Sequence, residues 1–239
     1  FNIVGLPDAA VNEARERVNS AIKNNGASPP HHSNRRVIVN LAPADLKKEG
    51  PVYDLPIAVA FLIASGQLKT APLNDKIFIG ELSLDGEVRS LRGALAIALM
   101  AKENGFRQLF LPAENAAEAA IVKEIEVFGI EDLGQLMSHL VGRTIIKPTP
   151  KTDLEQFYQK TAFPLDLAQI KGQQSAKRAL EIVAAGAHNL LMNGPPGTGK
   201  TLLAQALISI LPRLEIDEAL EVTKIFSVAG RLSPRQPLL

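Results

Sequence analysis

The chain has 239 residues, enough for two ordinary domains or one large one, and its 46% hydrophobic content is typical of globular proteins. Its formal net charge of +1 gives no global field that would by itself recruit nucleic acid, and the lack of cysteine excludes disulfides, thiolate metal sites and thiol catalysis. The longest apolar runs, such as residues 57–64, are too short to span a bilayer, so the cytoplasm is the expected compartment.

The first part of the chain mixes helix and strand signals. Apolar residues at helical spacing predict an amphipathic helix over 7–26, and a nearly continuous apolar run predicts a buried helix over 55–68. The dipeptide Asp85-Gly86 predicts a hairpin whose returning strand begins at Val88. Further strands are expected at 36–41, 77–82 and 108–111, and further helices at 91–104, 116–122 and 135–140. This mixture favours an α+β domain over a doubly wound sheet.

Two polar features of this domain each have a functional and an ordinary explanation. His31 and His32 could suggest a metal site, but no third ligand lies at a recognisable spacing, so a solvated loop is favoured. The basic pairs Arg35-Arg36 and Lys47-Lys48 are the best candidates here for contacts with DNA phosphates. An ordinary solvated surface is the favoured explanation of both pairs.

A proline-rich, polar stretch at 147–153 predicts a linker between domains. We therefore expect a first domain over 1–144, a linker over 145–164 and a second domain over 165–239. In the second domain a helix over 173–185 leads into a short apolar run at 189–193, which predicts a buried parallel strand.

The most informative motif follows that run. It has a glycine, four residues and then Gly-Lys-Thr: Gly194, Pro195, Pro196, Gly197, Thr198, Gly199, Lys200 and Thr201. Glycines let such a loop curl until backbone N–H groups converge on phosphate oxygens. Lys200 would bind the β and γ phosphates, and the Thr201 hydroxyl would be a ligand of Mg²⁺. A helix expected over 202–208, beginning with Leu202, completes the strand, loop and helix order. The motif predicts a site for a nucleoside triphosphate.

The chain resembles the magnesium-chelatase-like AAA+ ATPases of the YifB/ComM type. In the second domain the resemblance rests on residues 166–173, 184–191, the glycine-rich loop and 218–221. In the first it rests on residues 4–8, 39–46 and 53–58, among which the run Asn-Leu-Ala-Pro-Ala-Asp-Leu is the most specific. The resemblance covers essentially the whole chain, and implies an α/β P-loop AAA+ fold for the second domain.

The first domain in turn is similar to the proteolytic domain of Lon proteases, which implies a ribosomal-S5-like fold. The similarity is visible at residues 80–86 and 111–115. Lon cleaves peptides with a serine activated by a lysine, and both partners are needed. The region that should carry the serine has Val52, Tyr53 and Asp54, and residues 93–98, which should carry the lysine, contain none. Asp54 is therefore expected to cap the following helix, and the domain to lack protease chemistry.

The family resemblance also implies cofactors and partners. It implies ATP and Mg²⁺ as cofactors, with Ile170 among the residues that flank adenine. It further implies a hexameric ring without a membrane partner, in which ATP turnover drives branch migration in DNA during natural transformation. Two alternatives stay open: a chelatase-like motor that reshapes a protein or inserts a metal, and a scaffold whose nucleotide only orders a ring.

An AAA+ site also needs an acidic pair at the end of a second apolar strand, together with an arginine from a neighbouring subunit. Asp217-Glu218 is the only comparable pair beyond the loop, but Pro212 and the charges before it argue against a central strand. We expect this pair to lie in the solvated first turn of the next helix. The sequence therefore predicts that the chain lacks the hydrolytic half, binds ATP or ADP weakly at best and hydrolyses neither.

Overall fold

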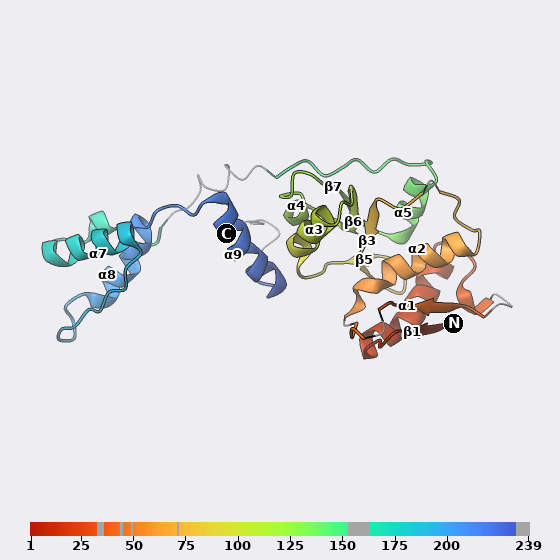
Figure 1. Ribbon diagram of the computed structural model, residues 1–239, viewed down its shortest axis with the longest axis horizontal. Helices are drawn as coiled ribbons and strands as arrows, with labels where there is room; N and C mark the ends of the chain where they lie inside the picture. Colours follow the sequence, from red (N-terminus) through yellow and green to blue (C-terminus); the bar gives the residue numbers. More distant parts are fainter. Residues whose placement is uncertain (33–35, 44, 49, 71, 153–162, 233–239) are drawn as a thin grey trace. The chain divides into compact units, whose positions relative to one another are not determined.

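The computed structural model describes residues 1–32, 36–43, 45–48, 50–70, 72–152 and 163–232. Two compact units divide the chain: unit 1 comprises Phe1–Leu154 with Glu221–Leu239, and unit 2 comprises Glu155–Leu220. Figure 1 shows helices and short strands mixed along unit 1, and mainly helices in unit 2. None of the described helices is long and apolar enough to cross a membrane.

Unit 1 opens with a strand that was not predicted, followed by the expected amphipathic helix. Strand β1 (Asn2–Val4) pairs in parallel with β2 (Ile38–Asn40), and α1 (Ala9–Asn24) buries Val11, Ala14, Val18 and Ile22. The short 3-10 helices η1 (Pro30–His32) and η2 (Pro51–Tyr53) lie on either side of β2 in the sequence. Helix α2 (Asp54–Ala64) follows η2. It is apolar on nearly every face, and it therefore packs into the core.

The largest sheet of unit 1 is parallel, with strand order β3-β6-β7. Its strands are β3 (Lys76–Phe78), β6 (Gln108–Pro112) and β7 (Glu126–Ile130), of which β7 was not predicted. Phe78, Phe110 and Phe128 lie in register on the three strands, and their rings stack with centroids 4.8 and 4.7 Å apart. These rings join the main core of the unit.

The predicted hairpin is confirmed, although the strand predicted over 77–82 is wrong as one continuous element. It splits into β3 and β4 (Glu81–Leu82), and β4 pairs antiparallel with β5 (Val88–Arg89). The split occurs because the backbone of Gly80 bonds outside the sheet: its N–H donates to Val52 O and its carbonyl accepts from Leu55 N. Gly80 thus ties the hairpin to the start of α2.

The other helices within residues 72–152 precede or follow the strands of the parallel sheet in the sequence. Helix α3 (Ala94–Glu103) leads into β6, and η3 (Ala113–Asn115) with α4 (Ala116–Ala119) leads into β7. Helix α5 (Leu133–Leu140) follows β7 and is capped by Asp132, whose carboxylate accepts from Gln135 N at 2.8 Å. The observed fold is thus a mixture of helices and strands with parallel sheets.

The polar stretch expected to be a linker is bonded to unit 1 over residues 146–152, which we call the strap. Ile146 N donates to His139 Nδ1 at 3.1 Å, and Thr149 N donates to Val127 O on the outer strand β7 at 2.7 Å. Lys151 Nζ donates to the carbonyls of Val122 and Ile125, and Thr152 Oγ1 to that of Ala117. Residues 153–162 of the expected linker lie outside the described residues.

We expect the strap to loosen in acid at one end only. His139 packs against Phe110 and Phe128. Burial lowers the pKa of His139 below 6.5, whereas a hydrogen bond with the Thr144 backbone raises this pKa and the charge of Lys76 lowers it. The neutral ring that accepts from Ile146 is therefore favoured above pH 6.5, and its stabilisation is lost as pH falls below that value. Hydrogen-exchange protection factors should fall at the Ile146 amide and not at the Thr149 amide, whose acceptor is a carbonyl. A flat pH profile at Ile146 would contradict this.

Unit 2 is built from short helices around a small core. It contains η4 (Leu167–Gln169), α7 (Gln174–Gly186), α8 (Lys200–Ala206) and η5 (Leu207–Ile210), and α9 (Ile216–Val228) begins in it. The core comprises Leu167, Ile170, Leu180, Leu203 and Ala206.

The buried strand predicted over 189–193 is wrong in this structure. The segment forms no strand, and Leu191 is 91% exposed. A parallel strand needs neighbours on its sheet, and the described residues of unit 2 supply none. An apolar run therefore was not sufficient to specify a strand.

Candidate nucleotide-binding site

The glycine-rich loop forms a tight bend immediately before α8. Gly197 and Gly199 have φ angles of +80° and +84°, which other residues rarely adopt, and Gly199 is the residue that precedes the first turn of the helix. Helix α8 begins at Lys200, two residues earlier than predicted. The loop and its helix are thus arranged in the order that the motif requires, although the strand before them is absent.

Lys200 folds back across the loop. Its Nζ donates to the carbonyls of Gly194 and Pro195, both at 2.8 Å, and lies 3.5 Å from Thr198 Oγ1. The Thr198 hydroxyl donates to Pro195 O at 2.9 Å. These bonds concentrate the lysine charge inside the bend that is expected to surround the phosphates.

The donors around this bend fit a phosphate group. The amides of Lys200 and Thr201 belong to the first turn of α8, where backbone N–H groups have no acceptor within the helix. The partial positive charge of these amides adds to that of the lysine, so an anion is favoured there. Thr201 and Leu202 are both exposed, with Leu202 at 45%. The loop therefore offers a cation, backbone donors and a hydroxyl to one ligand.

Ile170, expected beside adenine, is only 7% exposed and packs in the small core with Leu203 from α8. Its carbonyl accepts from Lys177 Nζ. Leu167 N, nearby in the same core, donates to Ser209 Oγ at 3.0 Å. Ile170 thus supports the helix that follows the loop, and its contact with adenine stays a prediction.

The acidic pair beyond the loop lies in the first turn of a helix, as predicted. Asp217 and Glu218 are exposed in the first turn of α9, and Glu218 Oε2 accepts from Glu215 N at 2.9 Å. Carboxylates at this end of a helix are stabilised by the helix dipole. The assignment to a solvated helix start is confirmed.

Among the described residues of the two basic pairs, Lys48 departs from the expected solvated surface, whereas Arg36 and Lys47 agree with it. Lys48 is 6% exposed, and its ammonium donates to the carbonyls of Pro43 and Leu46, because the backbone wraps around it. It is unsuited to a phosphate contact. Arg36 and Lys47 are exposed, whereas Arg35 lies outside the described residues. Exposed His31 lies 4.0 Å from Glu16, and His32 lies in η1. The described residues contain no group of three or more histidine, aspartate or glutamate side chains able to hold a metal ion.

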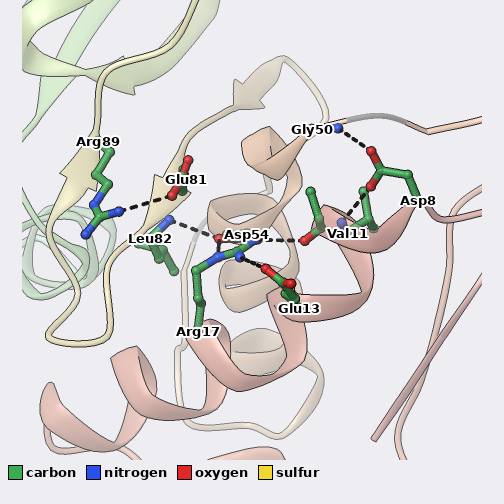
Figure 2. Close-up of polar contacts among 10 residues, drawn as sticks. Asp8, Val11, Glu13, Arg17, Gly50, Asp54, Glu81, Leu82 and Arg89 are labelled. Carbon is green, nitrogen blue, oxygen red and sulfur yellow. Dashed lines mark hydrogen bonds and ion pairs between the residues drawn. The ribbon is translucent and has the colours of Figure 1, made fainter.

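Asp54 does not cap α2, contrary to expectation. It is the first residue of the helix, and its buried carboxylate accepts from Arg17 Nε at 2.5 Å, Arg17 Nη2 at 3.1 Å and Leu82 N at 3.1 Å (Figure 2). Burial raises the pKa of Asp54, while the hydrogen bonds from Arg17 and Leu82 oppose that rise. The hydrogen bond to Asp54 raises the pKa of Arg17. One ion pair thus connects α1, α2 and the hairpin.

Figure 2 also shows a second carboxylate that joins distant backbone segments. Asp8 caps α1 by accepting from Val11 N at 2.8 Å, and its other oxygen accepts from Gly50 N at 3.1 Å. These two backbone bonds lower the pKa of Asp8. Neither carboxylate faces a serine or lysine among the contacts drawn, so their arrangement is that of a structural network.

Comparison with known proteins identifies similar chains along the whole length. Residues 1–115 match a family model described as "Subunit ChlI of Mg-chelatase", and residues 166–238 match one described as "Magnesium chelatase, subunit ChlI". An uncharacterised Mycobacterium tuberculosis protein is 45% identical over 241 residues, covering 100% of this chain and 46% of its own length.

Two named bacterial proteins are nearly as similar. YifB of Escherichia coli is 42% identical over 230 residues, covering 96% of this chain and 44% of its own length. Competence protein ComM of Haemophilus influenzae is 42% identical over 231 residues, covering 95% of this chain and 44% of its own length. The chain therefore spans about half the length of the curated relatives it matches.

Proposed function

Because this chain belongs to the magnesium-chelatase-like proteins of the YifB/ComM type, we propose that it carries the nucleotide-binding loop of an AAA+ motor that remodels DNA. The observation that supports this most directly is the bend at Gly197 and Gly199 with the Lys200 ammonium inside it. The link to DNA and competence is inferred from similarity to ComM.

In this proposal the residues of the loop have separate tasks. Lys200 exchanges its two carbonyl bonds for phosphate oxygens, and the amides at the start of α8 orient the same group. Thr201 holds Mg²⁺ through its hydroxyl, and Leu202 with Ile170 borders the nucleotide. Bound MgATP supplies the phosphoanhydride bond whose hydrolysis drives the motor. The acidic pair and the partner arginine would come from elsewhere in the full-length protein.

We further propose a division into a Lon-protease-like domain over 1–144, a linker over 145–164 and the start of the AAA+ domain over 165–239. The first domain would act without a serine and lysine pair, and the full-length protein would assemble into a hexameric ring in the cytoplasm. The strap at residues 146–152 supports a tighter attachment of the expected linker to the first domain than its composition predicts.

Salt dependence distinguishes a DNA motor from a protein-remodelling motor or a scaffold. We expect the full-length protein to bind branched DNA with an affinity that falls steeply as salt rises, because each neutralised phosphate releases counterions. ATPase activity should also rise on addition of the same DNA. The measurement is a binding isotherm at several salt concentrations, with phosphate release in parallel. Salt-independent binding and unstimulated turnover would exclude the DNA function and leave the alternatives.

A further inference from the structure

A glutamine outside the loop motif holds the loop in place. The side chain of Gln173 donates from Nε2 to the carbonyl of Thr198, at 3.3 Å. Gln173 precedes α7, so this bond joins the residue before one helix to the bend before another. The two residues are 25 positions apart, and both belong to unit 2.

The backbone of Gln173 adopts a conformation that glutamine normally avoids. Its φ and ψ angles are +56° and +38°, in the left-handed region, where a side chain with a Cβ is strained. The residue before a helix usually has an extended backbone and a side chain that caps the helix. Gln173 does neither, because its side chain is directed to Thr198. Strain at such a position is a reason to look for a function.

The geometry of the peptide bond connects this contact to the phosphate site. The Thr198–Gly199 peptide is trans, so its carbonyl and its N–H point in opposite directions. When Gln173 holds the Thr198 carbonyl on one side, the Gly199 amide must face the other side. The neighbouring bonds from Lys200 hold the carbonyls of Gly194 and Pro195 in the same way.

We propose that Gln173 is a positioning residue for the nucleotide, which fixes the Thr198–Gly199 peptide so that its amide is presented to a phosphate oxygen. This inference rests on the proposed function of the loop. It assigns the strained turn before α7 a role in nucleotide affinity, and predicts that losing the side chain leaves the loop free to rotate this peptide. The ligand is the phosphate portion of a nucleotide, so ATP and ADP should be affected alike.

The test compares substitutions at Gln173 in the full-length protein. Gln173→Ala should weaken MgATP and MgADP binding by about 3-fold to 10-fold, the effect of one lost hydrogen bond. The Michaelis constant for ATP should rise by a similar factor while kcat changes little. Gln174→Ala is the matched control, since Gln174 is the adjacent exposed residue on α7, and it should bind as the parent protein does.

Gln173→Gly separates positioning from stability. Glycine relieves the left-handed backbone, so the melting temperature should stay the same or rise, whereas nucleotide affinity should fall as in Gln173→Ala. Affinity that follows stability across the three variants would overturn the inference. If Lys200→Ala weakens binding but Gln173→Ala and Gln173→Gly bind normally, the inference fails and the proposed function stands. If Lys200→Ala also binds normally, the proposed function itself fails.

Discussion

Replacing Asp54 with alanine should destabilise unit 1 by about 3–5 kcal/mol, the usual cost of removing one partner of a buried ion pair. The substitution leaves the Arg17 guanidinium, whose side chain is only 15% exposed, without its buried carboxylate partner, and leaves the Leu82 amide without that acceptor. Urea denaturation followed by circular dichroism measures the effect. Since the pair connects α1, α2 and β4, we expect a single cooperative transition at a lower urea concentration.

The control for this prediction is the other acidic partner of Arg17. Glu13 lies 3.7 Å from Arg17 Nη1 and its side chain is 76% exposed, so Glu13→Ala should change the free energy of unfolding by less than about 1 kcal/mol. The double variant Arg17→Met with Asp54→Leu should recover most of the stability, because apolar pairs of similar volume can replace buried ions. A small effect of Asp54→Ala, equal to that of Glu13→Ala, would show that the pair is not buried in solution.

Replacing Lys200 with alanine should weaken nucleotide binding by about 1.5–3 kcal/mol, which corresponds to roughly 10-fold to 150-fold in the dissociation constant. The loss follows from removing the charged donor to the phosphates, while the bend at Gly197 and Gly199 remains. Calorimetry with MgATP measures it.

A charge-matched control identifies a specific contact. Arg213→Ala removes one exposed positive charge from unit 2 outside the loop, and should leave the affinity for MgATP nearly unchanged. Equal losses in both variants would indicate a general electrostatic effect.

Local signals predicted those parts of the fold whose geometry is decided by neighbouring residues. Asp85-Gly86 specified the hairpin because few other residues allow the tight turn between its strands. Helix α1 was predictable from its apolar face and from Asp8, which caps it. The bend at Gly194–Thr201 belongs to the same class, since the positive φ angles at Gly197 and Gly199 favour glycine.

The features that were missed depend on residues distant in the sequence. The run at 189–193 resembles a strand, but a strand needs partners on a sheet. Strand β7 was not predicted, although its Val127 and Phe128 are good strand formers. Asp54 was expected to cap a helix because its partner Arg17 lies 37 positions away, where the residues next to Asp54 give no sign of it. Lys48 is an exception, because the carbonyls that accept from it belong to Pro43 and Leu46, close in the sequence, and its burial depends on how this loop folds.

The three stacked phenylalanines stabilise one register of the parallel sheet. Side chains alternate between the two faces of a strand, so sliding β6 by one residue would carry Phe110 to the opposite face and break both ring contacts at once. A misaligned sheet would therefore lose two favourable aromatic contacts together. This ladder of rings discriminates between neighbouring alignments of three strands that hydrogen bonding alone would leave nearly equivalent.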